Sequence, residues 1–198
     1  TGYAEVCDAL HESVERILGD SVLSAFLCGA IVDQKTCDAV AVMTARAQAG
    51  EAQIVRASGP YAHPDFDSAR TATPLMLAVD AQQGDMYGQE HFGPISFLIA
   101  CDDAEHGLQQ ATSDVRKHGA ITSHVYSCDE AFLARAEEAY HAAGASLSCN
   151  LVGMPINFAA AYSDFHVTGL NPSGNACLTD LAFVTNRFRI VQTRYPDA

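Results

Sequence analysis

Apolar residues recur at helical spacing in the part of the chain before Gly50. The first run of this kind places five apolar residues on one face: Val6, Leu10, Val14, Ile17 and Leu18. This spacing predicts an amphipathic helix, which Gly19 can end. A second helical pattern covers residues 34–49 and stops at Gly50. We expect each helix to pack its apolar face against a core.

Short apolar runs follow the two helical patterns and predict strands. Residues 52–58 form a short candidate strand, and the continuous apolar run at 74–79 predicts a buried one. The segment between them, residues 58–74, is rich in Pro, His, Asp and Ser and predicts a long loop.

The second half of the chain alternates between strands and helices. Apolar runs predict strands at residues 94–100, 120–127 and 145–152. The residues between these strands have the polar and apolar spacing of amphipathic helices. Strand, helix and strand in this order, with short connections, predict right-handed crossovers between parallel strands.

Capping residues set the expected helix ends in this half. Asp102 can cap the first helix, with Glu105 in the reciprocal position, and that helix runs to about Lys117. Ser127 and Glu130 match a Ser-x-x-Glu capping box for the second helix, which is predicted to end near residue 144.

These elements predict an α/β fold with a mainly parallel sheet flanked by helices. The strands that begin near Pro74 and Ile95 are apolar on both faces, as a sheet covered by helices requires. We expect residues 1–198 to form a single domain. After the last of these strands come a long aromatic loop at 153–177, a short helix at 180–188 and a more polar strand at about 188–195.

Composition excludes several classes of function. Apolar residues make up 48% of the chain and charged residues 18%, which is typical of a globular protein. The net charge is -13, with 11 Lys and Arg against 24 Asp and Glu, so nucleic acids and anionic membrane surfaces are disfavoured as partners. No apolar run approaches the roughly 20 residues of a membrane span, and no signal-peptide pattern opens the sequence.

The seven cysteines are scattered, odd in number and without a Cys-x-x-Cys pair. In a chain of this size they predict reduced, mostly buried thiols in the cytoplasm. No pair has the spacing to a histidine that zinc sites use, so we expect no metal.

The most distinctive motif is EHFGP, residues 90–94, directly before a buried strand. The dinucleotide-binding Gly-x-Gly-x-x-Gly, the P-loop, Gly-x-Ser-x-Gly and His-Glu-x-x-His are all absent. The motif and the segments HGAITSHVYSCD and GASLSCN that follow it resemble the catalytic domain of aldehyde dehydrogenases, in order and spacing, over about half of the chain. The final loop departs from the usual pattern of that family and is more similar to the PaaN-type branch of phenylacetate degradation.

The resemblance implies an oxidoreductase that oxidises an aldehyde with NAD or NADP, using a cysteine thiolate and a glutamate base. In the family this cysteine lies about a hundred residues before the Glu-x-Phe-Gly-Pro motif, whereas only 91 residues precede Phe92. Cys7 lies on a predicted helix and lacks the Gly-Gln context of the nucleophile. We therefore expect a C-terminal portion whose nucleophile and base lie upstream, with no catalytic residue in this chain and no activity of the chain alone.

The resemblance assigns Glu90 and Phe92 to the cofactor. The Glu90 carboxylate would accept hydrogen bonds from the nicotinamide-ribose hydroxyls, and Phe92 would pack beside the nicotinamide ring. The alternative interpretations are an exposed loop acid and a core aromatic. Gly93 and Pro94 are expected to form a tight turn that aims the two residues before them.

Other candidate residues belong to the substrate side. Asn150 matches the family's asparagine at the substrate entrance, although a turn-forming asparagine is an equal alternative. Phe158, Tyr162 and Phe165 could line a substrate funnel, with core packing as the alternative for at least two of them. His91 and His166 are candidate acid or base residues, more simply explained as surface or hydrogen-bonded histidines.

The sequence thus predicts part of an aldehyde dehydrogenase-like enzyme, oxidising a small aldehyde from aromatic breakdown, in a homo-oligomer. The final strand, at about 188–195, is a candidate oligomerisation segment. One alternative is a stand-alone α/β domain that binds a small ligand without catalysis and has a closed sheet. Another is a thiol-dependent acyl-transfer or hydrolytic enzyme, in which one cysteine would be alkylated far faster than the other six.

Overall fold

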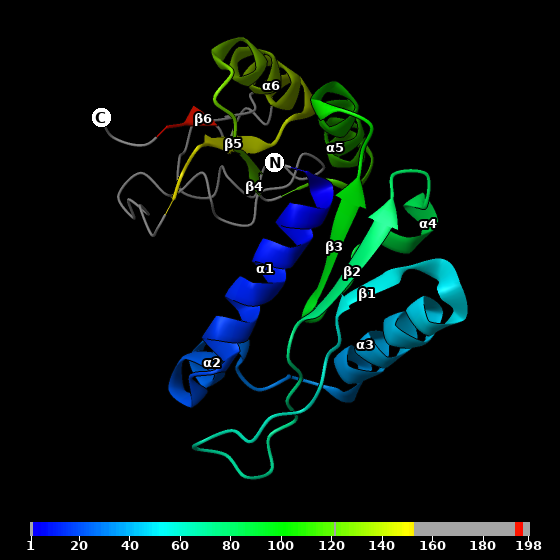
Figure 1. Ribbon diagram of the computed structural model, residues 1–198, viewed down its shortest axis with the longest axis vertical. Coiled ribbons are helices and arrows are strands. Elements are labelled where there is room, and N and C mark those ends of the chain that lie inside the picture. Colours follow the sequence, from blue (N-terminus) through cyan, green and yellow to red (C-terminus); the bar gives the residue numbers. More distant parts are fainter. Residues whose placement is uncertain (1, 121, 153–192, 196–198) are drawn as a thin grey trace, which may run out of the picture. The chain divides into compact units, whose positions relative to one another are not determined.

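The computed structural model describes residues 2–120, 122–152 and 193–195 (Figure 1). The chain divides into two compact units, Thr1–Cys101 and Asp102–Ala198. Both units contain helices and strands, which confirms the predicted α/β class. A single domain over residues 1–198 stays a prediction.

The first unit contains a three-stranded sheet in the order β1-β2-β3. Its strands are β1 (Gln53–Arg56), β2 (Leu75–Asp80) and β3 (Ile95–Ala100). Strands β2 and β3 are parallel, with Leu75 opposite Ile95 and Val79 opposite Ile99. Strand β1 is antiparallel to β2, so the sheet of this unit is mixed.

The helices of the first unit differ in part from those predicted. They are α1 (Tyr3–Leu18), α2 (Ser21–Cys28), α3 (Gln34–Arg46), the π-helical turn η1 (Ala47–Glu51) and α4 (Gly84–Tyr87). The predicted helix at 34–49 is therefore α3 continued by η1. Helix α2 was not predicted, although the Asp20 side chain caps it by accepting hydrogen bonds from the N–H groups of Val22 and Leu23, both at 2.9 Å.

Helix α1 forms as predicted, but the apolar face expected to meet the core is partly exposed. Tyr3 and His11 hydrogen-bond backbone carbonyl oxygens of β3 and β1, at 2.6 and 2.8 Å. Cys7, between them at the four-residue spacing of one helical face, is buried. Val6 and Leu10 are 42% and 40% exposed. Polar contacts to the sheet, rather than the apolar stripe alone, set how this helix lies.

Strand β2 lies at the centre of the first core. Leu75 and Leu77 are fully buried, and the strand stays buried through Val79. The core cluster consists of Val40, Met43, Ala47, Leu75, Leu77, Val79 and Met86. Strand β3 is mostly half-buried, because it is an edge strand of this three-stranded sheet. Both strands are apolar on both faces in sequence, but of the two only β2 is buried along most of its length.

The described part of the second unit contains a parallel sheet in the order β4-β5-β6 and the two helices α5 and α6. Its elements are α5 (Ala104–His118), β4 (Thr122–Val125), α6 (Glu130–Ala143), β5 (Ser146–Cys149) and β6 (Thr193–Arg194). Leu147 and Cys149 of β5 are fully buried and pack in one cluster with Leu133 and Tyr140 of α6. The predicted order of strands and helices is confirmed here.

The predicted capping residues of both helices in this unit are wrong. Asp103, not Asp102, caps α5. Its carboxylate accepts a hydrogen bond from the N–H of His106 at 2.7 Å. Asp129 caps α6 in place of the predicted Ser127 and Glu130 box. In each case the capping aspartate has extended backbone angles, which the N-cap position requires.

Strand β6 pairs in parallel with β5 of the same chain. The rest of the predicted strand at 188–195 lies outside the described residues, as do the predicted loop at 153–177 and helix at 180–188. An oligomerisation role for this segment stays a prediction.

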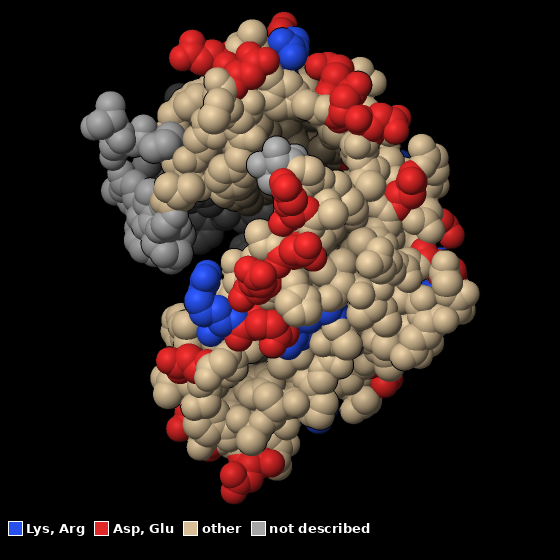
Figure 2. Space-filling view, viewed as in Figure 1, with Lys and Arg blue, Asp and Glu red and all other residues tan. Residues whose placement is uncertain are grey.

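Acidic side chains are spread over the face of the molecule drawn in Figure 2, with fewer basic ones among them. This distribution agrees with the net charge of -13. Within the described part of the chain, no helix is both long and apolar enough to cross a membrane.

Candidate functional site

The EHFGP motif lies in the connection between β2 and β3, which contains α4. Met86 of α4 is 1% exposed and belongs to the first core cluster. The N–H of Asp80 donates to Gln83 Oε1 at 2.7 Å, and the Tyr87 hydroxyl donates to the carbonyl oxygen of Ala81 at 2.6 Å. These contacts anchor α4 to the end of β2 and fix the path toward the motif.

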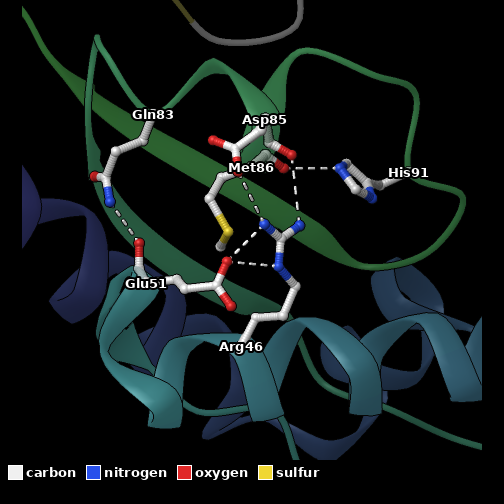
Figure 3. A network of polar contacts seen from close by, with 6 residues as sticks. All are labelled: Arg46, Glu51, Gln83, Asp85, Met86 and His91. Carbon is white, nitrogen blue, oxygen red and sulfur yellow. Dashed lines mark hydrogen bonds and ion pairs between the residues drawn. The ribbon is translucent and has the colours of Figure 1, made fainter.

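Arg46 joins α3 to this connection (Figure 3). Its Nη2 and Nε donate to Glu51 Oε2 at 2.6 and 2.9 Å. Its Nη1 donates to the carbonyl oxygen of Asp85 at 3.4 Å, and Gln83 Nε2 donates to the carbonyl oxygen of Glu51 at 2.6 Å. The hydrogen bond to Glu51 raises the pKa of the Arg46 guanidinium. Arg46 thus supplies a permanent charge between η1 and α4.

His91, the second residue of the motif, is directed back toward α4 (Figure 3). Its Nε2 lies 2.9 Å from the carbonyl oxygen of Met86, and because a carbonyl only accepts, the ring nitrogen is the donor. The half-buried ring also lies against Phe97, with ring centroids 5.4 Å apart. His91 is therefore the hydrogen-bonded histidine of the simpler sequence interpretation.

The residues on either side of His91 face outward. Glu90 is exposed, and Phe92 is 72% exposed. Among the described residues, the Glu90 carboxylate has no hydrogen-bond or ion-pair partner. Phe92 is not a core aromatic of the described structure. A free carboxylate beside an exposed ring can accept hydrogen bonds from a diol and stack on a planar group.

Gly93 and Pro94 form the predicted tight turn. The N–H of Ile95 donates to the carbonyl oxygen of Gly93 at 2.8 Å, and the N–H of Leu75 donates to that of Pro94 at 2.7 Å. Gly93 has a φ of 140°, and a Cβ there would lie 3.1 Å from Thr36 Cγ2 of α3. A side chain at this position would be strained and crowded, so the turn requires glycine.

Asn150 lies in the second unit, directly after β5. Its Oδ1 accepts the N–H of Ser127 and its Nδ2 donates to the carbonyl oxygen of Ser127, both at 2.9 Å. Its φ of 53° is left-handed, which asparagine tolerates better than most residues. This geometry fits the turn-forming alternative. A hollow of about 450 Å³ lies beside it, lined in part by Cys128, Glu137 and Tyr195.

The remaining sequence candidates lie outside the described residues: Phe158, Tyr162, Phe165 and His166. Of the residues predicted to bind a cofactor or substrate, the described structure therefore brings together only Glu90 and Phe92. Asn150 belongs to the other unit.

None of the six described cysteines forms a disulfide. Cys7 and Cys149 are buried and Cys128 is exposed, while the other three are half-buried, so the prediction of mostly buried thiols is wrong for this part of the chain. Desolvation by burial raises the pKa of the Cys28 and Cys149 thiols, which makes both weaker nucleophiles at neutral pH. The described residues contain no group of three side chains able to hold a metal ion.

Sequence reasoning missed the network around Arg46. Glu51 lies five positions after Arg46, which is not the three- or four-residue spacing of helix neighbours, and the backbone between them leaves the helical conformation at Gly50, whose φ is 93°. Asp85 is 39 residues away in sequence. A contact of that range leaves no local pattern, so only the tertiary structure shows it.

Comparison with known proteins identifies the chain's relatives. The model of the aldehyde dehydrogenase family matches residues 2–158. Among solved structures, the chain is similar to the crystal structure of an NAD-dependent aldehyde dehydrogenase from Burkholderia multivorans, with 40% identity and a TM-score of 0.80. The match covers 96% of this chain and 34% of that chain, so the chain spans about a third of that protein's length. A search of curated proteins found no match.

Proposed function

The chain belongs to the aldehyde dehydrogenase family, and we propose that it is part of an enzyme that oxidises an aldehyde to a carboxylic acid with NAD or NADP. Within that enzyme, this chain supplies contacts to the cofactor rather than the nucleophile. The nucleophilic cysteine and the general base are expected from residues upstream, as the resemblance of the motif implies.

One observation carries the proposal: Glu90 and Phe92 face solvent on the same stretch, on either side of an anchored residue. Exposed, unpartnered side chains held by a fixed backbone are what a ligand contact needs, because little entropy is then lost on binding. A folded loop that served only the core would bury Phe92.

The chain's own residues suit a dinucleotide. Glu90 would accept hydrogen bonds from the two ribose hydroxyls through its carboxylate oxygens. Phe92 would pack against the nicotinamide and exclude water from one side of it. A bound NAD or NADP would supply the acceptor for the hydride that leaves the aldehyde carbon. The Gly93 turn holds both residues in place before the cofactor arrives.

The substrate, the choice of cofactor and the assembly belong to the same proposal. The resemblance of the final loop to the PaaN-type branch favours an aldehyde from aromatic degradation, with Asn150, Phe158 and Phe165 near it. The hollow of about 450 Å³ beside Asn150 supports that placement. The NAD-dependent relative favours NAD over NADP. The scattered, odd-numbered cysteines favour the cytoplasm, and the family resemblance favours a homo-oligomer.

An assay of the complete protein tests the proposal. Purified protein is mixed with NAD or NADP and either an arylacetaldehyde or a straight-chain aldehyde, and formation of the reduced cofactor is followed. We expect turnover, fastest with the arylacetaldehyde and NAD, and no turnover by the 198-residue chain alone. Binding of an aldehyde or cofactor without any turnover of the complete protein would favour the ligand-binding alternative instead.

A further inference from the structure

We propose that His91 is a positioning residue that directs Glu90 and Phe92 toward the bound dinucleotide. The inference rests on the proposed function and adds to it a role for the one residue of the motif that faces inward. The family motif leaves this position open, so the resemblance assigns it no task.

Exposure alternates along the three residues. Glu90 and Phe92 are exposed, whereas His91 between them is half-buried. Residues 90–92 belong to no helix or strand, and the alternation of their exposure shows that His91 points to the opposite side from its two neighbours. Fixing the middle residue inward therefore fixes its two neighbours outward. Since the Glu90 carboxylate has no partner among the described residues, the backbone alone sets its direction.

The inward anchor is strong because it is attached to the core. His91 Nε2 donates to the carbonyl oxygen of Met86 at 2.9 Å, and the Met86 side chain is 1% exposed. The ring is also held against Phe97 of β3. His91 thus connects the motif at once to the core through α4 and to the strand that follows.

The acceptor is itself held in place. Helix α4 is a single turn, and its last carbonyl groups lack partners within the helix. His91 takes the carbonyl oxygen of Met86, and Arg46 takes that of Asp85 at 3.4 Å (Figure 3). The side chains of His91 and Arg46 therefore hold two consecutive carbonyl groups of α4. Through these hydrogen bonds, α4 connects α3 to the residue next to Glu90.

The test compares His91→Leu with His91→Gln in the complete protein. Leucine keeps an apolar contact with Phe97 but loses the donor, whereas glutamine keeps an N–H at a similar reach. We expect His91→Leu to raise the KM for NAD about tenfold, the effect of one lost hydrogen bond, with the KM for aldehyde unchanged. With aldehyde deuterated at the reacting carbon, the isotope effect on kcat should increase because hydride transfer slows. His91→Gln should restore most of both values.

Two further variants separate the possible outcomes. His118→Leu, at an exposed histidine of the second unit, should leave every constant unchanged. If Glu90→Gln raises the KM for NAD but His91→Leu does not, the positioning role of His91 is wrong and the proposed function stands. If neither variant affects the cofactor, the proposed function fails as well. Equal loss for NAD and aldehyde, without rescue by glutamine, would make His91 a residue of general stability and overturn the inference.

Discussion

Gly93 is the residue of the motif whose identity the structure constrains most tightly. Its φ is 140°, and a Cβ at this position would approach Thr36 Cγ2 to 3.1 Å, which is closer than an ordinary contact. We predict that Gly93→Ala lowers the free energy of unfolding by about 1–3 kcal/mol, because the backbone would be strained and the Thr36 side chain would have to shift. Denaturant unfolding of the two proteins measures this difference.

A second glycine provides the control. Gly59 has no atom within 4 Å of a Cβ position and no left-handed backbone angle, so Gly59→Ala should be neutral or slightly stabilising. If Gly93→Ala were as stable as Gly59→Ala, the turn would not have the conformation described. The proposal that this turn orients Glu90 and Phe92 would then be contradicted.

Thiol reactivity provides a prediction with a clear pH dependence. Burial raises the pKa of the Cys149 thiol, so its reactive thiolate is scarce until the pH exceeds the ordinary thiol value of about 8.5. Cys128 is exposed. At pH 8 we expect iodoacetamide to label Cys128 first and Cys149 last among the described cysteines, with Cys149 labelling increasing on the alkaline side. Peptide mass spectrometry over time gives the rates.

The same experiment tests the thiol-enzyme alternative. A single cysteine with a buried, activated thiolate would be labelled fastest despite its burial. Rapid labelling of Cys149 or Cys28 at neutral pH would contradict the expectation that the nucleophile lies upstream, and would favour that alternative.

Residues of the site differ in how far sequence could predict them. Glu90, Phe92 and Gly93 stand in a short motif, so their placement follows from local chain geometry. The inward direction of His91 depends on the carbonyl group of Met86, and the part played by Arg46 depends on Asp85, 39 residues away. Pairs that meet only after the chain has folded leave no spacing to recognise.

At the scale of single elements, adjacent aspartates provide a matched test of helix capping. Asp103 accepts the N–H of His106 at 2.7 Å, whereas Asp102 is an exposed neighbour that contacts the His106 ring. We predict that Asp103→Ala costs about 1 kcal/mol of stability, the usual effect of losing an N-cap. Asp102→Ala should cost clearly less. Thermal unfolding monitored by circular dichroism measures both, and a larger loss for Asp102→Ala would support the capping assignment made from sequence.

Elements were predicted better than their ends and faces. The strands and the long helices follow from hydrophobic spacing, because burial of one face decides where they lie. The caps of α5 and α6 were misplaced because several Asp and Ser residues stand side by side, and only the backbone angles select among them. The position of helix α1 in the sequence was predicted correctly, but the face that it presents to the sheet was not. Its hydrogen bonds to the sheet are made by Tyr3 and His11 rather than by the apolar residues.

At the scale of the whole molecule, the main open prediction is the single domain. Leu77 and Leu147 are both fully buried, one in each compact unit. Replacing either by alanine should cost about 2–5 kcal/mol, from lost burial and a residual cavity. If the chain unfolds as one cooperative domain, Leu77→Ala should lower the hydrogen-exchange protection of β5 as much as that of β2.

Leu147→Ala is the reciprocal variant and should show the same behaviour. Loss of protection confined to β2 and β3 in one variant, and to β4 and β5 in the other, would instead show two independently stable domains.

The central claim is that Glu90 holds the cofactor, and replacing it in the complete protein tests this most directly. Glu90→Gln keeps the shape and removes the charge, so the KM for NAD should rise by about 10–100-fold, the effect of losing charge-assisted hydrogen bonds. The KM for aldehyde should not change. Glu138→Gln, at an exposed position on α6, is the control and should match the unmodified enzyme. A Glu90→Gln enzyme with an unchanged KM for NAD and an unchanged kcat would contradict the claim.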